Sequence, residues 1–122
     1  MKKENQNKIY QERLDLLLSE MKKRGFKGKY NLNNNNNIEW NIDSNIMLEI
    51  LLEGHGGDDL IIIYFTDPSG RKNENYDELN SNTNEELLKV LSEYNNYKIE
   101  IKEKKGLFGK KYILTYDGKE TI

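Results

Sequence analysis

Two long apolar runs separated by a short polar stretch constrain the fold of this chain most strongly. Residues 46–53 and 60–65 are its most apolar segments, and residues 54–59 between them are mainly glycines and acids, which favour turns. Two strands joined by a reversal are therefore expected. The alternative is a helix over residues 46–53, because Leu, Met and Glu are good helix formers. Eight residues without an apolar stripe fit a strand better.

The expected pairing of these strands separates an apolar face from a mixed one. With Glu53 opposite Leu60, every residue on one face is apolar. These residues are Leu48, Ile50, Leu52, Ile61, Ile63 and Phe65. The other face mixes apolar residues with acids and places Glu49 opposite Tyr64. This acid-bearing face is left over once the core face has been assigned, so it is a candidate binding surface.

Composition indicates one small folded unit. The 122 residues suffice for one core but not for two. Hydrophobic residues make up 35% and charged residues 33%, yet the apolar residues are bunched into runs, so a single folded domain over residues 1–122 is expected. Without cysteine there is no disulfide, thiolate metal site or cysteine nucleophile. Abundant Asn, Lys, Ile and Tyr share A/T-rich codons, which predicts an A/T-rich bacterium, or its phage or mobile element, as the source.

Hydropathy and charge predict a cytoplasmic protein with segregated charges. No apolar run approaches the roughly 18 to 20 residues of a membrane span, and polar residues follow Met1 where a signal peptide would be apolar. Net charge is −2, with basic side chains concentrated in residues 1–30 and 98–122 and acidic ones in residues 31–97. Folding the basic ends onto the acidic middle is the favoured interpretation. The alternative is a bipolar surface that steers a charged partner.

The N-terminal third predicts a helix followed by two short strands. Apolar residues at helical spacing predict a helix over residues 5–24, stopped by Gly25. Alternating strands are expected on either side of the asparagine run at 33–37, which is read as a hairpin loop. Trp40, on the second of these strands, is predicted to be a core residue.

A turn, a loop and a second helix are expected after the central hairpin. Residues 66–70 contain proline and glycine at a reversal, and residues 71–82 are polar enough to be read as a loop. Thr83 and Glu86 have the spacing of a capping box at a helix start. Leu87, Leu88, Leu91 and Tyr94 supply the buried stripe of this helix.

The chain ends on a second predicted hairpin with a basic tip at residues 104–111. Pairing Lys102 with Lys111 places apolar residues together on one face. Leu107 and Phe108 lie at the tip between glycines and lysines, where they are hard to bury. The tip resembles the wing of a winged-helix domain, and this resemblance implies nucleic-acid contact. The lysines concerned are Lys104, Lys105, Lys110 and Lys111. A winged helix also needs a compact helix-turn-helix before the wing, whereas one helix and a β-hairpin precede this one.

Few residues suggest catalysis or metal binding. His55, the only histidine, lies beside Asp58 and Asp59, but one imidazole and two adjacent carboxylates make a weak metal site, and a solvated turn is the favoured reading. Glu49 and Glu53 point the same way on one strand, as paired catalytic carboxylates can, but are read as a solvated face. No serine has the surroundings of an activated nucleophile. We therefore expect no enzyme, no metal and no cofactor.

The sequence thus predicts an α+β protein with an antiparallel sheet of about six strands and two helices, in the order α-β-β-β-β-α-β-β. The function hypothesis is a small inhibitor or immunity protein that covers a toxin, nuclease or host defence factor. The predicted partner-binding residues are Glu49, Glu53, Asp58, Asp59, Tyr64, Leu107 and Phe108. The alternatives are a nucleic-acid-binding regulator that uses the four tip lysines, an enzyme or ligand-binding protein whose pocket the sequence does not reveal, and a homodimer through the mixed face.

Overall fold

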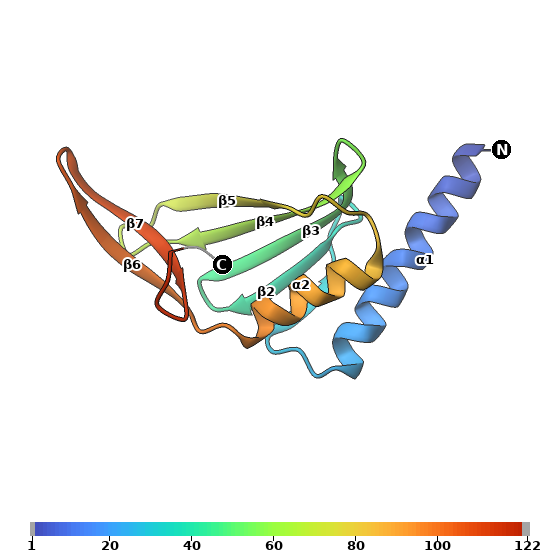
Figure 1. Ribbon diagram of the computed structural model, residues 1–122, viewed down its shortest axis with the longest axis horizontal. Coiled ribbons are helices and arrows are strands. Elements are labelled where there is room, and N and C mark those ends of the chain that lie inside the picture. Colours follow the sequence, from blue (N-terminus) through green and yellow to red (C-terminus); the bar gives the residue numbers. More distant parts are fainter. Residues whose placement is uncertain (1, 121–122) are drawn as a thin grey trace.

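The computed structural model describes residues 2–120, with side chains from residue 8 onward other than that of His55. The described residues form two helices and seven strands (Figure 1). The helices are α1 (Lys2–Lys23) and α2 (Asn84–Asn96). The strands are β1 (Lys29–Leu32), β2 (Ile38–Asp43), β3 (Ile46–His55), β4 (Asp58–Thr66), β5 (Lys72–Glu78), β6 (Ile99–Gly106) and β7 (Gly109–Tyr116). The predicted class, an antiparallel α+β fold with two helices, is confirmed.

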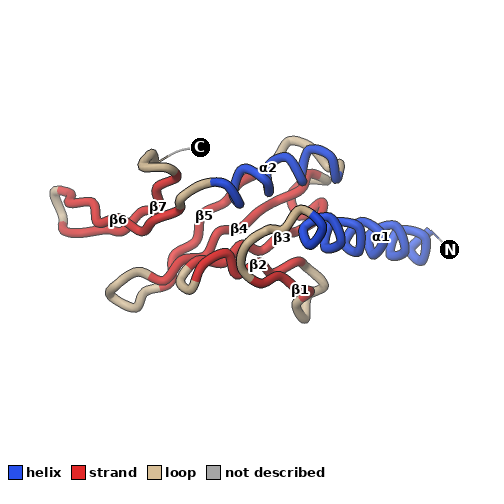
Figure 2. Tube along the Cα trace, turned by 90° about the horizontal axis from the view of Figure 1, so that it is seen from below, coloured by secondary structure: helices blue, strands red, loops and turns tan. Residues whose placement is uncertain are grey.

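The strands form two separate sheets. Strands β1 to β5 make an antiparallel sheet whose spatial order is the chain order, and β6 and β7 make a two-stranded ribbon. Both helices lie on one side of the five-stranded sheet (Figure 2). We call this side the inner face and the opposite side the outer face. Neither helix of the described chain is long and apolar enough to cross a membrane.

The core lies between the inner face and the two helices. Alternation along the strands sends every second side chain inward, so that Trp40, Leu48 and Ile63 follow one another across three strands. All three are at most 2% exposed. The helices contribute Leu14, Leu17, Met21, Leu87, Leu91 and Tyr94 to the same core. Trp40 is thus a core residue, as predicted.

A tight connection joins α1 to the sheet. Gly25 has φ +68°, and Phe26 donates its N–H to the carbonyl of Met21 at 3.0 Å, which closes the helix as the glycine predicted. The Phe26 ring then stacks on Trp40 with 5.3 Å between centroids. The Trp40 indole donates to the carbonyl of Lys27 at 2.8 Å. The segment after α1 is therefore fixed against β2.

The central hairpin forms as predicted, but its register differs by two residues. Leu51, and not Glu53, lies opposite Leu60, and the pairing is irregular between Leu51 and His55. Glu53 has φ +53°, and its N–H donates to the Asp59 carboxylate at 2.9 Å. This bulge accommodates the residues of β3 between Leu51 and His55, which fall outside the regular pairing with β4. Because a shift of two keeps each side chain on its face, the predicted faces remain correct.

Strand β5 was not expected, because residues 71–82 were predicted to be a loop. It pairs with β4 along its whole length and forms an edge of the sheet. Its inward side chains are polar and meet polar partners. Asn73 donates to Asp67 at 3.0 Å, and Asp77 accepts the Tyr94 hydroxyl at 2.7 Å. Because its inward side chains are polar, this strand lacks the alternation of apolar and polar residues from which a strand is predicted.

The second helix begins as its sequence predicts. Thr83 accepts a hydrogen bond from the Glu86 N–H at 3.3 Å. The ribbon after it is longer than expected. Lys104, and not Lys102, pairs with Lys111, and the strands continue to Gly106 and Gly109. Only Leu107 and Phe108 then form the turn, where an eight-residue tip was predicted.

Candidate functional site

The outer face of the sheet carries a continuous patch of apolar side chains. Met47 pairs with Tyr64, and Ile62 pairs with Tyr76. Leu51, diagonal to Ile62, extends the same surface. Four of these side chains are half-buried, and Tyr76 is 61% exposed. We call these five residues the outer apolar patch.

Carboxylates lie beside and between these apolar side chains. The pairing places Glu39 next to Glu49, and Glu49 next to Ile62, in one row across the sheet. Glu74 pairs with Tyr64 in the neighbouring row. A hollow of about 360 Å³ lies at one end of the patch, and its lining includes Met47, Tyr64 and Glu74. The outer face can therefore make apolar contacts and attract positive charge.

Glu49 is held by three donors. Asn33 and Asn37 donate their side-chain amides to one carboxylate oxygen at 2.9 and 3.1 Å, and the Tyr64 hydroxyl donates to the other at 3.0 Å. Burial acts to raise the pKa of Glu49, but these hydrogen bonds outweigh it and hold the pKa below its usual value. Burial and the hydrogen bond to Glu49 raise the pKa of Tyr64 to about 12. The carboxylate is thus ionised and fixed in place near neutral pH.

The asparagine run is an ordered part of this site. Asn33 also accepts the N–H groups of Asn35 and Asn37 at 3.0 Å, and Asn36 takes φ +61°. The run is a hairpin loop, as predicted. No pattern in the sequence indicated that two of its amides reach a carboxylate on β3.

The other predicted acids do not join Glu49. Glu53 is exposed at the bulge, and Asp58 is half-buried beside the Gly56-Gly57 turn. Asp59 is fully buried, where it receives two hydrogen bonds from the Arg13 guanidinium, at 2.9 and 3.2 Å. Asp59 was predicted to contact a partner, but its carboxylate lies inside the protein and binds α1, so it is not on the surface of the described structure.

Metal binding at the central turn depends on a side chain that lies outside the described residues, that of His55. Within the part of the chain that is described, no group of three His, Cys, Asp or Glu residues could hold a metal ion.

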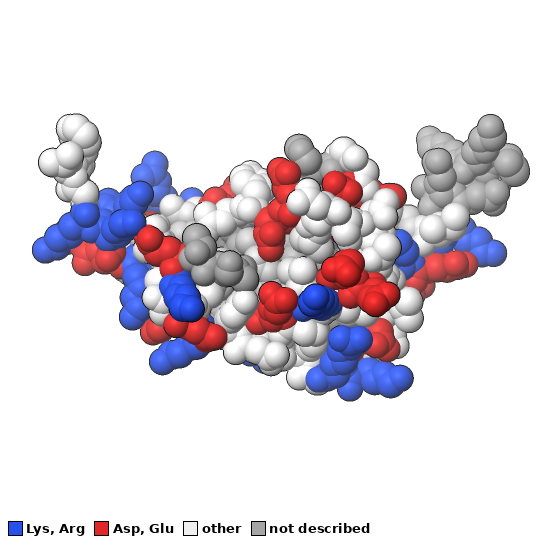
Figure 3. Space-filling model, viewed as in Figure 1, with Lys and Arg blue, Asp and Glu red and all other residues white. Residues whose placement is uncertain are grey.

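The ribbon tip is a second surface, away from the outer face. Leu107 and Phe108 are 97% and 103% exposed, and lysines flank them on both strands. Figure 3 shows the ribbon at the left as a basic projection with an uncharged end. The structure therefore places the two apolar tip residues beside the four tip lysines and separates them from Glu49 and Tyr64.

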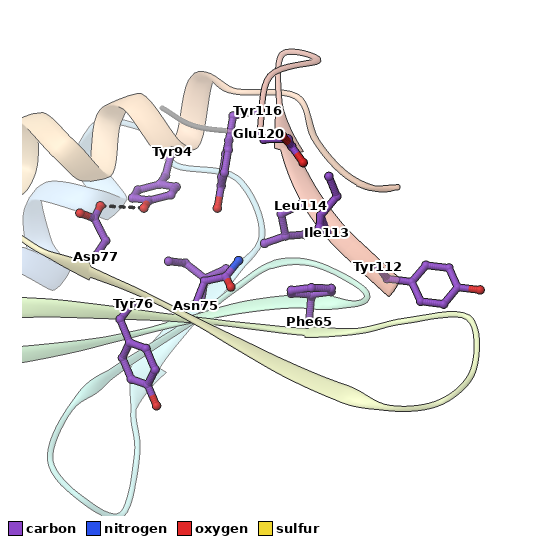
Figure 4. A pocket seen from close by; sticks show the side chains of 11 residues that line it. Phe65, Asn75, Tyr76, Asp77, Tyr94, Tyr112, Ile113, Leu114, Tyr116 and Glu120 are labelled. Carbon is purple, nitrogen blue, oxygen red and sulfur yellow. Dashed lines mark hydrogen bonds between the residues drawn. The ribbon is translucent and has the colours of Figure 1, made fainter. Parts of the chain in front are cut away.

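A hollow of about 590 Å³ separates β5 from β7 (Figure 4). Tyr94 bonds to Asp77 on one side of it, whereas Tyr76 points away, toward the outer face. Burial, with the charge of Asp77, raises the pKa of Tyr116 to about 12. The polar lining depends on β5, so the sequence could not indicate this hollow while residues 71–82 were read as a loop.

Comparison of the chain with protein-family models, curated proteins and solved structures gives no significant match.

Proposed function

We propose that this chain is a non-enzymatic binding protein that docks its outer face on another protein and covers that protein's functional surface. The observation that carries the proposal is the outer apolar patch on the side of the sheet opposite the helices. When one face of an antiparallel sheet packs on the core, the solvated face is normally polar. Here that face presents Met, Leu, Ile and two Tyr side chains.

The chemistry of this face is typical of an interface. The centres of protein interfaces are enriched in aromatic residues and methionine and depleted of charge, with polar groups at the rim. Met47, Tyr64 and Tyr76 supply the first kind of side chain, and Glu39 and Glu74 supply carboxylates beside them. Aromatic side chains also dominate the energetic centres of interfaces.

The charge of this face favours a basic partner. Glu49 is already held by its three donors, so binding would cost little further ordering of that side chain. A fixed carboxylate within an apolar surface suits a partner that presents Arg or Lys beside apolar groups. Nucleases present basic surfaces to their anionic substrates, so we propose an inhibitor or immunity protein of the kind that mobile elements encode.

The test is affinity capture with paired variants from nuclease-treated lysate of the source cell. The face variants are Ile62→Lys and Tyr76→Ala. Leu16→Ala is the matched control, because Leu16 is also an exposed apolar residue, 52% exposed, but lies on α1. We expect one protein to be retained stoichiometrically by the wild type and the control. Both face variants should bind it about 30-fold less tightly, the effect of losing about 2 kcal/mol at a central contact.

Retention of the same proteins by all four forms would contradict this function. So would a purified wild-type chain that is dimeric and becomes monomeric in both face variants, because a second copy would then occupy the patch. Thermal melts of every variant establish that the folded state is being compared.

A further inference from the structure

We infer that the β6–β7 ribbon is a binding arm for duplex DNA, independent of the outer face. Its four tip lysines contact the two phosphate backbones, and Leu107 and Phe108 act as an apolar wedge at the base stack.

The arrangement of the tip lysines destabilises the ribbon. Lys104 pairs directly with Lys111, and Lys105 pairs directly with Lys110. Like charges directly opposite on neighbouring strands are destabilising. Lys104 and Lys110 bind Glu120 and Glu103 at 2.8 and 3.2 Å, but these are exposed ion pairs of little energetic value. Two successive lysine pairs fit an anionic ligand better than they fit a structural role.

The ribbon is basic as a whole. Residues 99–116 contain five lysines and two glutamates, a net charge of +3, although the chain as a whole is at −2. The positive charge is concentrated at the end that projects from the body (Figure 3). Phosphate neutralisation by lysine supplies most of the affinity of sequence-independent DNA binding.

The lysines point to both sides of the ribbon. Successive side chains of a strand alternate in direction, so Lys104 and Lys111 lie on one face and Lys105 and Lys110 on the other. A DNA groove has phosphates on both walls, and β-ribbon proteins place their strands in the major or the minor groove. A bilayer offers its charge in one plane. The two-sided arrangement therefore favours a duplex over an anionic membrane.

The turn supplies an apolar wedge. Leu107 and Phe108 are almost completely exposed at the end of the arm. Proteins that bind DNA in the minor groove often insert Phe, Leu or similar side chains between base steps and kink the duplex. A two-residue turn holds both side chains at the leading end of the ribbon, beyond both lysine pairs.

The experiment uses the full chain and a mixed-sequence duplex of about 30 base pairs. Fluorescence anisotropy measures binding over about 50 to 200 mM salt. We expect log K to fall against log salt with a slope of about −3 to −4, as four phosphate contacts require. Lys105→Gln with Lys110→Gln should reduce the slope by about 2 and weaken binding at least tenfold at low salt.

The matched control removes the same charge elsewhere. Lys22→Gln with Lys23→Gln changes two exposed lysines at the end of α1 and should leave the slope and the affinity near those of the wild type. Equal weakening by the two double variants would overturn the inference, because net charge and not the ribbon would then control binding. The inference would also be overturned if the wild-type chain did not bind the duplex at low salt.

A third variant tests the wedge. Leu107→Ser with Phe108→Ser should keep the salt slope but lose duplex bending, measured by energy transfer between dyes at the two DNA ends. If this variant bent the duplex as much as the wild type does, Leu107 and Phe108 would not act as a wedge. Vesicles with and without phosphatidylserine test the competing ligand, and flotation with the anionic vesicles in the absence of DNA binding would assign the tip to a lipid surface.

Discussion

Glu49 contributes both to the stability of the fold and to the candidate binding face. Its three donors come from the β1–β2 loop and from β4, so one carboxylate joins the asparagine run to the outer apolar patch. Since its pKa is lowered by folding, ionised Glu49 stabilises the folded state. That stabilisation is complete above the pKa of an unfolded-chain glutamate, about 4.3. It is lost as the pH falls through the lower pKa of the folded state.

We therefore expect Glu49→Gln to destabilise the protein at neutral pH by about 1 kcal/mol, the usual net contribution of one intramolecular hydrogen bond. The difference from wild type should shrink as the pH falls below about 4. Urea unfolding at a series of pH values measures it. In an Asn33→Ala, Asn37→Ala background the same substitution should cost less. A difference that stays constant down to pH 3 would show that the carboxylate charge is not involved.

Residue by residue, the site was partly predictable from sequence. Alternation along 46–53 and 60–65 placed Glu49 and Tyr64 on the face away from the core, because a strand's side-chain period does not depend on its partners. Asp59 could not be placed in this way. Its burial depends on Arg13, which lies 46 residues away in sequence and contacts it only in the folded protein.

Among the elements, helices and hairpins were predictable, whereas the edge strand was not. Gly25 and Thr83 stop and start helices by local chemistry, which the sequence shows directly. Strand β5 forms because β4 offers it a partner, and an edge strand needs no apolar alternation. The hairpin registers were wrong by two residues because the bulge at Glu53 and the turn at Leu107 depend on backbone geometry that composition does not reveal.

The connection between α1 and β1 provides a prediction about elements. Gly28 has φ +76°, and a Cβ there would lie 2.1 Å from the carbonyl oxygen of Asn41 on β2. We expect Gly28→Ala to separate this connection from β2 and to cost about 3 kcal/mol or more, since strain and a backbone clash both oppose it. Urea unfolding measures the cost. Trp40 fluorescence should change in the folded state, because its indole donates to the adjacent Lys27 carbonyl.

Gly25→Ala is the matched control for this substitution. Gly25 has a similar φ of +68°, but a Cβ there would meet nothing within 4 Å. It should cost about 1 kcal/mol, which is the conformational penalty alone. Equal costs at the two positions would show that the approach to Asn41 is not tight.

At the scale of the whole molecule, Arg13 joins three parts of the fold. From α1 its guanidinium binds Asp59 on β4 through two nitrogens, and its Nε donates to Asn84, the first residue of α2, at 2.7 Å. The Asp59 carboxylate also accepts the N–H of Glu53 in the bulge. One ion pair therefore sets the position of both helices against the sheet.

Asp59→Ala should cost about 3 to 5 kcal/mol, because it leaves the largely buried Arg13 guanidinium and the Glu53 N–H without their acceptor. Chemical denaturation measures this loss. Glu20→Ala, which breaks the exposed pair between Glu20 and Arg24, should change stability by less than about 1 kcal/mol. Similar losses for the two variants would mean that the Arg13–Asp59 pair is solvated and not a buried junction.

The strand order of the main sheet has a consequence for how the chain acquires its structure. Because β1 to β5 are neighbours in space in the order in which they occur in the chain, each strand can pair with the one before it as soon as both exist. Such local pairing lowers the contact order and favours rapid folding. The N-terminal helix is different, since Leu14, Leu17 and Met21 pack against strands that follow it. During synthesis α1 must therefore wait, with its apolar stripe uncovered, until the sheet that buries it has been made.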